Sequence, residues 1–136
     1  TYLSACIARV VAERGCSVAY ESAAAALSAF ETQRFSRDGE ESAAAASRVR
    51  EYLGCDLMIL DDLGTEMVTS FSVSALYQLI NTRLNSAKPT IISTNCTMDE
   101  LERKYGPQIM SRLEGEYLLL TFHGRDIRLQ RKERGI

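Results

Sequence analysis

The sequence lacks several features that would direct it to particular classes of protein. It has no excess of basic residues, since 16 Lys and Arg stand against 18 Asp and Glu, for a net charge of -2. A generally basic nucleic-acid binder is therefore excluded, and any contact with DNA has to come from a local patch. No apolar run approaches the roughly 20 residues needed to span a bilayer, so we expect no association with membranes.

The cysteines form no Cys-x-x-Cys pair and show no spacing typical of metal ligands. We interpret Cys6, Cys16, Cys55 and Cys96 as buried, reduced thiols of a cytoplasmic protein. The sequence opens without a signal peptide and without methionine, and its first residues already follow a helical pattern. We therefore expect it to be a segment of a longer polypeptide.

Hydrophobic residues at helical spacing predict a series of helices. A Thr97–Glu100 capping box opens one of them, and Gly106 and Pro107 end it. Residues 31–40 are polar and carry no period, which predicts a loop. The other expected helices are Leu3–Val11, a helix N-capped by Ser22 and running to Phe30, Glu41–Leu53, Val73–Leu84 and Ile109–Leu113.

Short β-prone runs alternate with these helices. They are Cys16–Tyr20, Asp56–Leu60, Thr90–Thr94 and Tyr117–Phe122. The runs are mostly unbroken apolar stretches, which is typical of strands buried on both faces. The alternation predicts an α/β layered fold with a largely parallel sheet.

Polar residues follow two of the predicted strands, at the edge where ligands bind in parallel sheets. Asp61 and Asp62 end one strand, and Asn95 follows the other. One carboxylate can hold Mg²⁺ and the next can polarise a water molecule for attack on a phosphoryl group. The amide of Asn95 can orient that water. Two solvated carboxylates in a turn, and an ordinary turn asparagine, are the alternative interpretation of these residues.

Four motifs, taken in order, resemble a known family. They are Leu57-Met-Ile-Leu-Asp-Asp-Leu-Gly-Thr-Glu66, Gln78-Leu-Ile-Asn-Thr-Arg83, Lys88-Pro-Thr-Ile-Ile-Ser-Thr-Asn95 and Ser111-Arg112-Leu113. The chain resembles the DnaC/DnaI-type helicase loaders and the related IstB transposition ATPases, which are AAA+ P-loop proteins. The resemblance implies a three-layer αβα P-loop NTPase core with a mostly parallel sheet.

The same resemblance implies a role for each polar residue. Asp61 and Asp62 would be the Walker B acids, with Asp61 as a ligand of Mg²⁺, and Asn95 would be sensor 1, which touches ATP. Arg112 would be the arginine finger offered to the ATP of a neighbouring subunit. Many AAA+ proteins have Glu where this sequence has Asp62. The shorter side chain suggests slow hydrolysis, which suits a switch better than a motor.

The opening residues, Thr1-Tyr-Leu-Ser-Ala5, resemble the continuation of the Walker A motif in this family. Thr1 would supply a hydroxyl to Mg²⁺ and contact the nucleotide. The glycine-rich loop, its Lys and the preceding strand are not among the 136 residues. We therefore interpret residues 1–136 as a single partial AAA+ domain and expect the segment alone to be inactive as an ATPase. In the family, the strand before that loop lies between the strands expected at Thr90–Thr94 and Tyr117–Phe122.

The function implied is that of an ATP-binding and ATP-hydrolysing DNA-replication protein of the DnaC type. Such a protein loads a replicative DNA helicase onto single-stranded DNA and self-associates through its ATP interfaces. An IstB-type transposition helper ATPase and a non-catalytic interaction domain are the alternatives. Basic and aromatic residues suited to single-stranded DNA are Arg34, Phe35, Arg37, Arg48, Arg50 and Phe71. Packing of the two phenylalanines in the core is the other interpretation.

Overall fold

A sheet of three parallel strands forms the centre of the computed structural model, which describes residues 1–124 and 126–135. Its strands are β1 (Val18–Ser22), β2 (Leu57–Leu63) and β3 (Thr90–Thr94), in that spatial order. Ser22 of β1 pairs with Asp61, and Leu60 of β2 pairs with Ile92. The carboxyl ends of all three strands therefore lie at one edge, as the predicted parallel arrangement requires.

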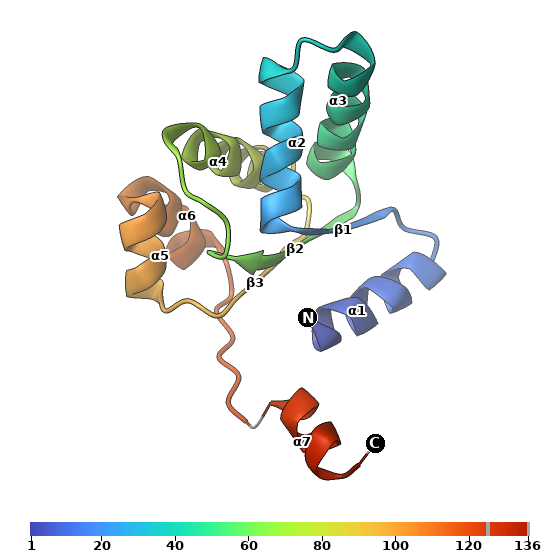
Figure 1. The fold of residues 1–136 in the computed structure, drawn as a ribbon, viewed down its shortest axis with the longest axis vertical. Helices are drawn as coiled ribbons and strands as arrows, with labels where there is room; N and C mark the ends of the chain where they lie inside the picture. Colours follow the sequence, from blue (N-terminus) through green and yellow to red (C-terminus); the bar gives the residue numbers. More distant parts are fainter. Residues whose placement is uncertain (125, 136) are drawn as a thin grey trace.

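Helices lie on both faces of the sheet (Figure 1). On one face α1 (Tyr2–Glu13) packs against β1 and β2. On the other face α2 (Ala23–Phe35) packs against the same strands, with α3 (Gly39–Gly54) and α4 (Ser70–Asn85) beside it. The predicted three-layer α/β fold is confirmed.

The remaining helices follow β3. The chain passes through α5 (Met98–Tyr105) and α6 (Pro107–Glu116), and α6 packs against α4. The last described helix, α7 (Ile127–Glu133), lies apart from the sheet (Figure 1). None of the helices within residues 1–124 and 126–135 combines the length and the hydrophobicity of a membrane span.

The main hydrophobic core lies around β2, α2 and α4. Met58 and Leu60 of β2 and Leu76 and Leu79 of α4 are completely buried. Burying a side chain of this size contributes roughly 1.5–3 kcal/mol. The alanine-rich start of α2 belongs to the same core, since small side chains such as Ala26 let the helix lie close to its neighbours.

The prediction of a loop over residues 31–40 is correct only for residues 36–38 and wrong for the rest. Helix α2 continues to Phe35, and α3 begins at Gly39. The Asp38 carboxylate accepts hydrogen bonds from the Glu40 and Glu41 amides at 2.9 and 3.0 Å, which caps α3. These turns lack a hydrophobic period because most of their side chains face solvent.

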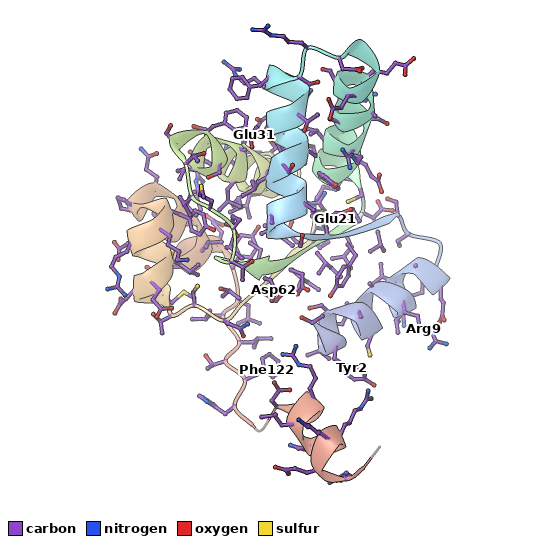
Figure 2. The ribbon with its side chains drawn as sticks, in the orientation of Figure 1. Tyr2, Arg9, Glu21, Glu31, Asp62 and Phe122 are labelled. Carbon is purple, nitrogen blue, oxygen red and sulfur yellow. The ribbon has the colours of Figure 1, made fainter. Side chains whose placement is uncertain are left out.

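The prediction of a strand at Tyr117–Phe122 is also wrong. Tyr117 packs against the core, but Leu118 and Phe122 are 85% and 73% exposed, and the described segment after α6 forms no strand. Figure 2 shows Phe122 on the segment that leads from α6 toward α7. A strand needs a hydrogen-bonded neighbour, and no described strand lies beside this run.

All four cysteines are free thiols, but they are not all buried. Cys55 is buried and Cys96 is half-buried, whereas Cys6 and Cys16 are exposed. The expectation of burial is therefore wrong for Cys6, on the solvent side of α1, and for Cys16, in the turn before β1.

A buried arginine ties together the starts of β2 and β3. Arg83 of α4 is 0% exposed. Its guanidinium group donates to the carbonyl oxygens of Tyr52 and Cys55 at 2.9 Å and of Pro89 at 2.8 Å. Its Nε donates to the Thr90 hydroxyl at 2.8 Å. The cation is thus held by backbone dipoles, and no ion pair of Arg83 occurs within the described residues.

Candidate functional site

The Asp61 carboxylate is the centre of a polar cluster at the carboxyl end of β2. Asp61 is 7% exposed. The hydroxyl of Thr1 donates to both of its oxygens at 3.3 Å, and the hydroxyl of Ser93 donates to Oδ1. The start of α1, the end of β2 and the end of β3 therefore meet at one carboxylate. The structure brings Thr1 and Asp61 together, the two residues expected to hold Mg²⁺.

Tyr20 fixes Thr1 in this position. The phenol oxygen of Tyr20 donates to the carbonyl oxygen of Thr1 at 3.2 Å. Burial, and next the negative charge of Asp61, raise the pKa of the Tyr20 phenol. The phenol therefore keeps its proton to a higher pH than an ordinary tyrosine and remains a hydrogen-bond donor.

Asp62 has a backbone conformation that is uncommon for residues other than glycine. Its φ is 56°, in the left-handed region, and Figure 2 shows it at the end of β2. Its amide donates to the Ser93 hydroxyl at 3.2 Å, and its carbonyl oxygen accepts from the Thr65 hydroxyl at 2.9 Å. Its carboxylate makes no hydrogen bond or ion pair with the described residues, so it remains available to a ligand or to water.

The turn after β2 is held at Gly64 by two side chains. The Gly64 amide donates to Glu66 Oε2 at 3.0 Å, and Lys104 of α5 donates to the Gly64 carbonyl oxygen at 2.6 Å. Gly64 has a φ of +103°, and a Cβ there would lie 2.5 Å from Cys96 Sγ. The turn thus needs glycine for both its conformation and its space.

Asn95 and Arg112 are not bonded to this cluster. Asn95 follows β3 at the same edge of the sheet and is exposed. The residue of β3 that reaches Asp61 is Ser93, two positions earlier. Arg112 lies on α6, half-buried, and its guanidinium makes no hydrogen bond or ion pair with described residues.

The oxygen donors at Asp61 suit Mg²⁺. A carboxylate and a hydroxyl converge, and hard cations prefer oxygen ligands. No three His, Cys, Asp or Glu residues gather into a metal site in the described part of the chain. Mg²⁺ is commonly held in nucleotide sites by only one or two protein oxygens together with phosphates and water. The residues therefore fit a magnesium ion of that kind.

A second cluster combines aromatic and basic side chains on the side of the molecule formed by α2 and α4. The rings of Phe35 and Phe71 meet edge to face with centroids 5.0 Å apart, and Phe35 is 59% exposed. The guanidinium of Arg34 lies 5.9 Å from the Phe35 ring centre. An open cleft of about 290 Å³ beside the rings is lined by Phe30, Gln33, Arg34, Phe71 and Gln78.

Comparison with known proteins identifies the family of the chain. Residues 1–134 match the family described as IstB-like ATP binding protein. The chain belongs to this family. Another similar protein is the replicative helicase loader DnaC of Escherichia coli (strain K12), 27% identical over 124 residues, which are 90% of this chain and 49% of DnaC. The chain thus spans about half the length of the curated relatives that it matches.

Solved structures confirm the fold of this IstB-like chain. A crystal structure of the DnaC helicase loader superimposes with a TM-score of 0.71 at 18% identity, covering 87% of this chain and 68% of that one. AMPPCP-bound DnaA from Aquifex aeolicus gives 0.65 at 22% identity, covering 95% and 40%. A replication initiator DnaA bound to AMPPCP and single-stranded DNA gives 0.69 at 20% identity, with the same coverage. The chain thus shares the fold of these DnaC and DnaA structures, as the family resemblance implies.

Proposed function

We propose that the protein is a cytoplasmic, ATP-hydrolysing DNA-replication protein of the DnaC type, which loads a replicative helicase onto single-stranded DNA. Membership of the IstB-like ATP-binding family and the similarity to DnaC support this assignment. The observation that carries it is the Thr1 hydroxyl, placed 3.3 Å from both Asp61 oxygens at the end of a buried parallel strand. In this proposal residues 1–136 are one part of an AAA+ ATPase domain.

Thr1 and Asp61 are the residues that would hold Mg²⁺. Bound there, the ion would neutralise charge on the phosphate oxygens of ATP. Ser93 and Tyr20 keep the two ligands in place, because they bond to the Asp61 carboxylate and to the Thr1 backbone. The glycine-rich loop that would bind the phosphates is not in the sequence, so ATP binding is a property to be tested in the full-length protein.

Three other residues would act on the water and on the phosphate. The carboxylate of Asp62, which has no partner among the described residues, would orient the attacking water and accept its proton. Asn95, exposed at the same edge, would help to orient that water. Arg112 has no partner within the described structure, which suits a group that binds the ATP of a neighbouring subunit. This role for Arg112 requires self-association of the protein.

The decisive experiment replaces Asp61 by Asn in the full-length protein. We expect Mg²⁺-dependent phosphate release to be abolished, because the neutral side chain no longer anchors the cation. Asp56→Asn is the matched control, since it makes the same change at the other end of the same buried strand. Circular dichroism checks that both variants fold. Equal turnover in Asp61→Asn and in the wild type would contradict the assignment of the site.

Mixing variants tests the role of Arg112. We expect Arg112→Ala to lower turnover about 10³- to 10⁵-fold while leaving ATP binding by a single subunit intact. A mixture with Asp61→Asn subunits should regain activity, since some interfaces then join an intact Asp61 to an intact Arg112. A mixture that assembles but remains inactive would exclude Arg112 as the residue acting across the interface.

Single-stranded DNA is the proposed ligand of the cluster formed by Arg34, Phe35 and Phe71. An exposed ring next to a guanidinium group can stack on a base and contact phosphate, each without regard to sequence. Loss of the Phe35 ring is expected to weaken binding of an oligothymidine by roughly 5- to 100-fold. Phe122→Ala removes another exposed phenylalanine, away from the cluster, and should leave affinity unchanged. Equal affinity of Phe35→Ala and wild type would exclude this surface.

A transposition helper of the IstB type is the second candidate, because the family match fits it as well as the loader. The two candidates differ in partner, so capture of a purified replicative helicase supports the loader and capture of a transposase supports the helper. A full-length protein that binds no nucleotide would instead be an interaction domain.

A further inference from the structure

The register between β2 and β3 gives one residue of β3 two acidic neighbours. Leu60 pairs with Ile92, and the next pair is Leu63 with Thr94. Asp61 and Asp62 therefore face a single residue, Ser93, across a β-bulge. Bulges interrupt the backbone ladder and redirect side chains, and they are frequent beside active sites.

The Ser93 hydroxyl bonds both acidic residues across this bulge. It donates its proton to Asp61 Oδ1 and accepts the amide proton of Asp62 at 3.2 Å. A hydroxyl has one proton to donate and two lone pairs that accept, so both contacts form at once. An alanine side chain can form neither.

The Asp62 backbone depends on such contacts. Its left-handed conformation, with φ 56°, is less favourable for a residue with a side chain than the common regions. The Asp62 amide donates to the Ser93 hydroxyl, and the Thr65 hydroxyl donates to the Asp62 carbonyl oxygen at 2.9 Å. The direction in which the Asp62 carboxylate leaves the chain is set by this pair of bonds.

We propose that Ser93 is a positioning residue, which sets the orientation of the Asp61 carboxylate and of the Asp62 backbone for metal binding and hydrolysis. The proposal rests on the function proposed above. Ser93 itself touches neither the metal nor the phosphate in this scheme and acts through the two acids.

The test uses Ser93→Ala in the full-length protein, with Mn²⁺ as a paramagnetic probe of the metal site. We expect affinity for Mn²⁺ in the presence of ATP, and kcat, each to fall roughly tenfold or more. Affinity for ATP in EDTA should not change. Amide hydrogen exchange at Asp62 should accelerate, and this readout requires no enzymatic activity.

Two further variants at Ser93 and one at its neighbour Thr94 distinguish an effect on positioning from an effect on stability. Ser93→Thr keeps the hydroxyl and should restore Mn²⁺ affinity and kcat, whereas Ser93→Cys keeps the volume with a weak donor and should fall between Ala and Thr. Thr94→Val removes the next hydroxyl along β3, which bonds the Leu63 carbonyl oxygen at 2.6 Å, and should leave Mn²⁺ affinity unchanged.

Each outcome supports or overturns the proposal. The proposal is overturned if Ser93→Ala keeps the wild-type Mn²⁺ affinity and the wild-type amide exchange at Asp62. It is also overturned if Mn²⁺ affinity falls in step with the melting temperature and Ser93→Thr does not restore it. Ser93→Cys provides the same comparison if the alanine variant fails to fold. A wild-type protein that neither binds nor hydrolyses ATP would refute the proposed function instead, while the exchange at Asp62 would still report the hydrogen bond.

Discussion

The two ends of strand β2 carry polar clusters that differ in what their polar atoms bind. At the amino end, the Ser17 amide donates to Asp56 Oδ2 at 2.8 Å and the Asp56 amide donates to Ser17 Oγ at 2.9 Å. Arg83, close by, donates to three carbonyl oxygens, to the Thr90 hydroxyl and to Cys55 Sγ. At the carboxyl end, by contrast, the Asp62 carboxylate has no partner among the described residues.

The two ends of β2 therefore differ in role: the amino end stabilises the fold, and the carboxyl end can bind a ligand. Groups that already have several bonding partners inside the protein contribute to stability and offer less to a ligand. The acids at the carboxyl end are oriented by Ser93 through few bonds and keep lone pairs available. We therefore expect substitutions at the amino end to change stability, and substitutions at the carboxyl end to change function.

The largest effect on stability is expected at Arg83. Arg83→Met keeps much of the buried volume but leaves the carbonyl oxygens of Tyr52, Cys55 and Pro89 without this donor. Each unsatisfied buried acceptor costs about 1–3 kcal/mol, and relief of the buried charge offsets part of this, so we expect a net loss of about 3 kcal/mol. Urea unfolding measures it. Arg112→Met is the control, expected within about 0.5 kcal/mol of wild type. Equal losses of unfolding free energy in Arg83→Met and Arg112→Met would contradict a special contribution of the Arg83 hydrogen bonds to stability.

An intermediate effect is expected at Gly64, the architectural part of the carboxyl end. Gly64→Ala places a Cβ 2.5 Å from Cys96 Sγ in a backbone with φ +103°. We expect a loss of about 1–2 kcal/mol in the free energy of unfolding. Adding Cys96→Ala should recover the steric part and leave the conformational part. Gly115→Ala, where a helical Cβ meets nothing within 4 Å, should instead stabilise by up to about 1 kcal/mol. If Gly64→Ala and Gly115→Ala both destabilise the protein, the loss at Gly64 cannot be assigned to the close contact with Cys96.

The smallest effect is a pH dependence at Asp56. Hydrogen bonds from Ser17, the backbone amide first, hold the pKa of the Asp56 carboxyl below its usual value. A lowered pKa means that this stabilisation is present above the unfolded-state pKa and is lost as pH falls through the folded-state pKa. The difference in unfolding free energy between wild type and Asp56→Asn should therefore shrink between about pH 6 and about pH 2. If this difference in unfolding free energy stays constant over the pH range, it does not come from the charge of the Asp56 carboxylate.

Local chemistry explains which elements could be predicted from the sequence. The capping box of Thr97 and Glu100 is present, and α5 ends at Gly106 as predicted. The strand predicted at Thr90–Thr94 agrees with β3 residue for residue. In the helix the deciding residues are neighbours in the chain, so its ends need no tertiary information.

Long-range pairing explains what could not be predicted. Thr90–Thr94 and Tyr117–Phe122 are similar apolar runs, but only the first has a neighbouring strand to pair with. The burial of Arg83 follows from its place on the inner face of α4, whereas its residue type alone favours exposure.

Part of the candidate site could be predicted as well. Thr1 and Asp61 meet as the motifs imply, because each lies at the end of an element facing the same sheet edge. The contacts of Ser93 with the two acids were missed because they depend on the bulge, which sequence periodicity does not show. Its signal was a hydroxyl residue just before the predicted sensor asparagine, in the run Ser93-Thr94-Asn95.

The left-handed backbone at Asp62 limits which acid the position can carry. Asp and Asn adopt this conformation more readily than residues with longer side chains. A change to glutamate would lengthen the reach of the carboxylate but would oppose the turn of the chain. A change to asparagine would suit the turn but remove the charge. A glutamate at position 62 would therefore favour a different backbone conformation, and with it different hydrogen bonds to Ser93 and Thr65.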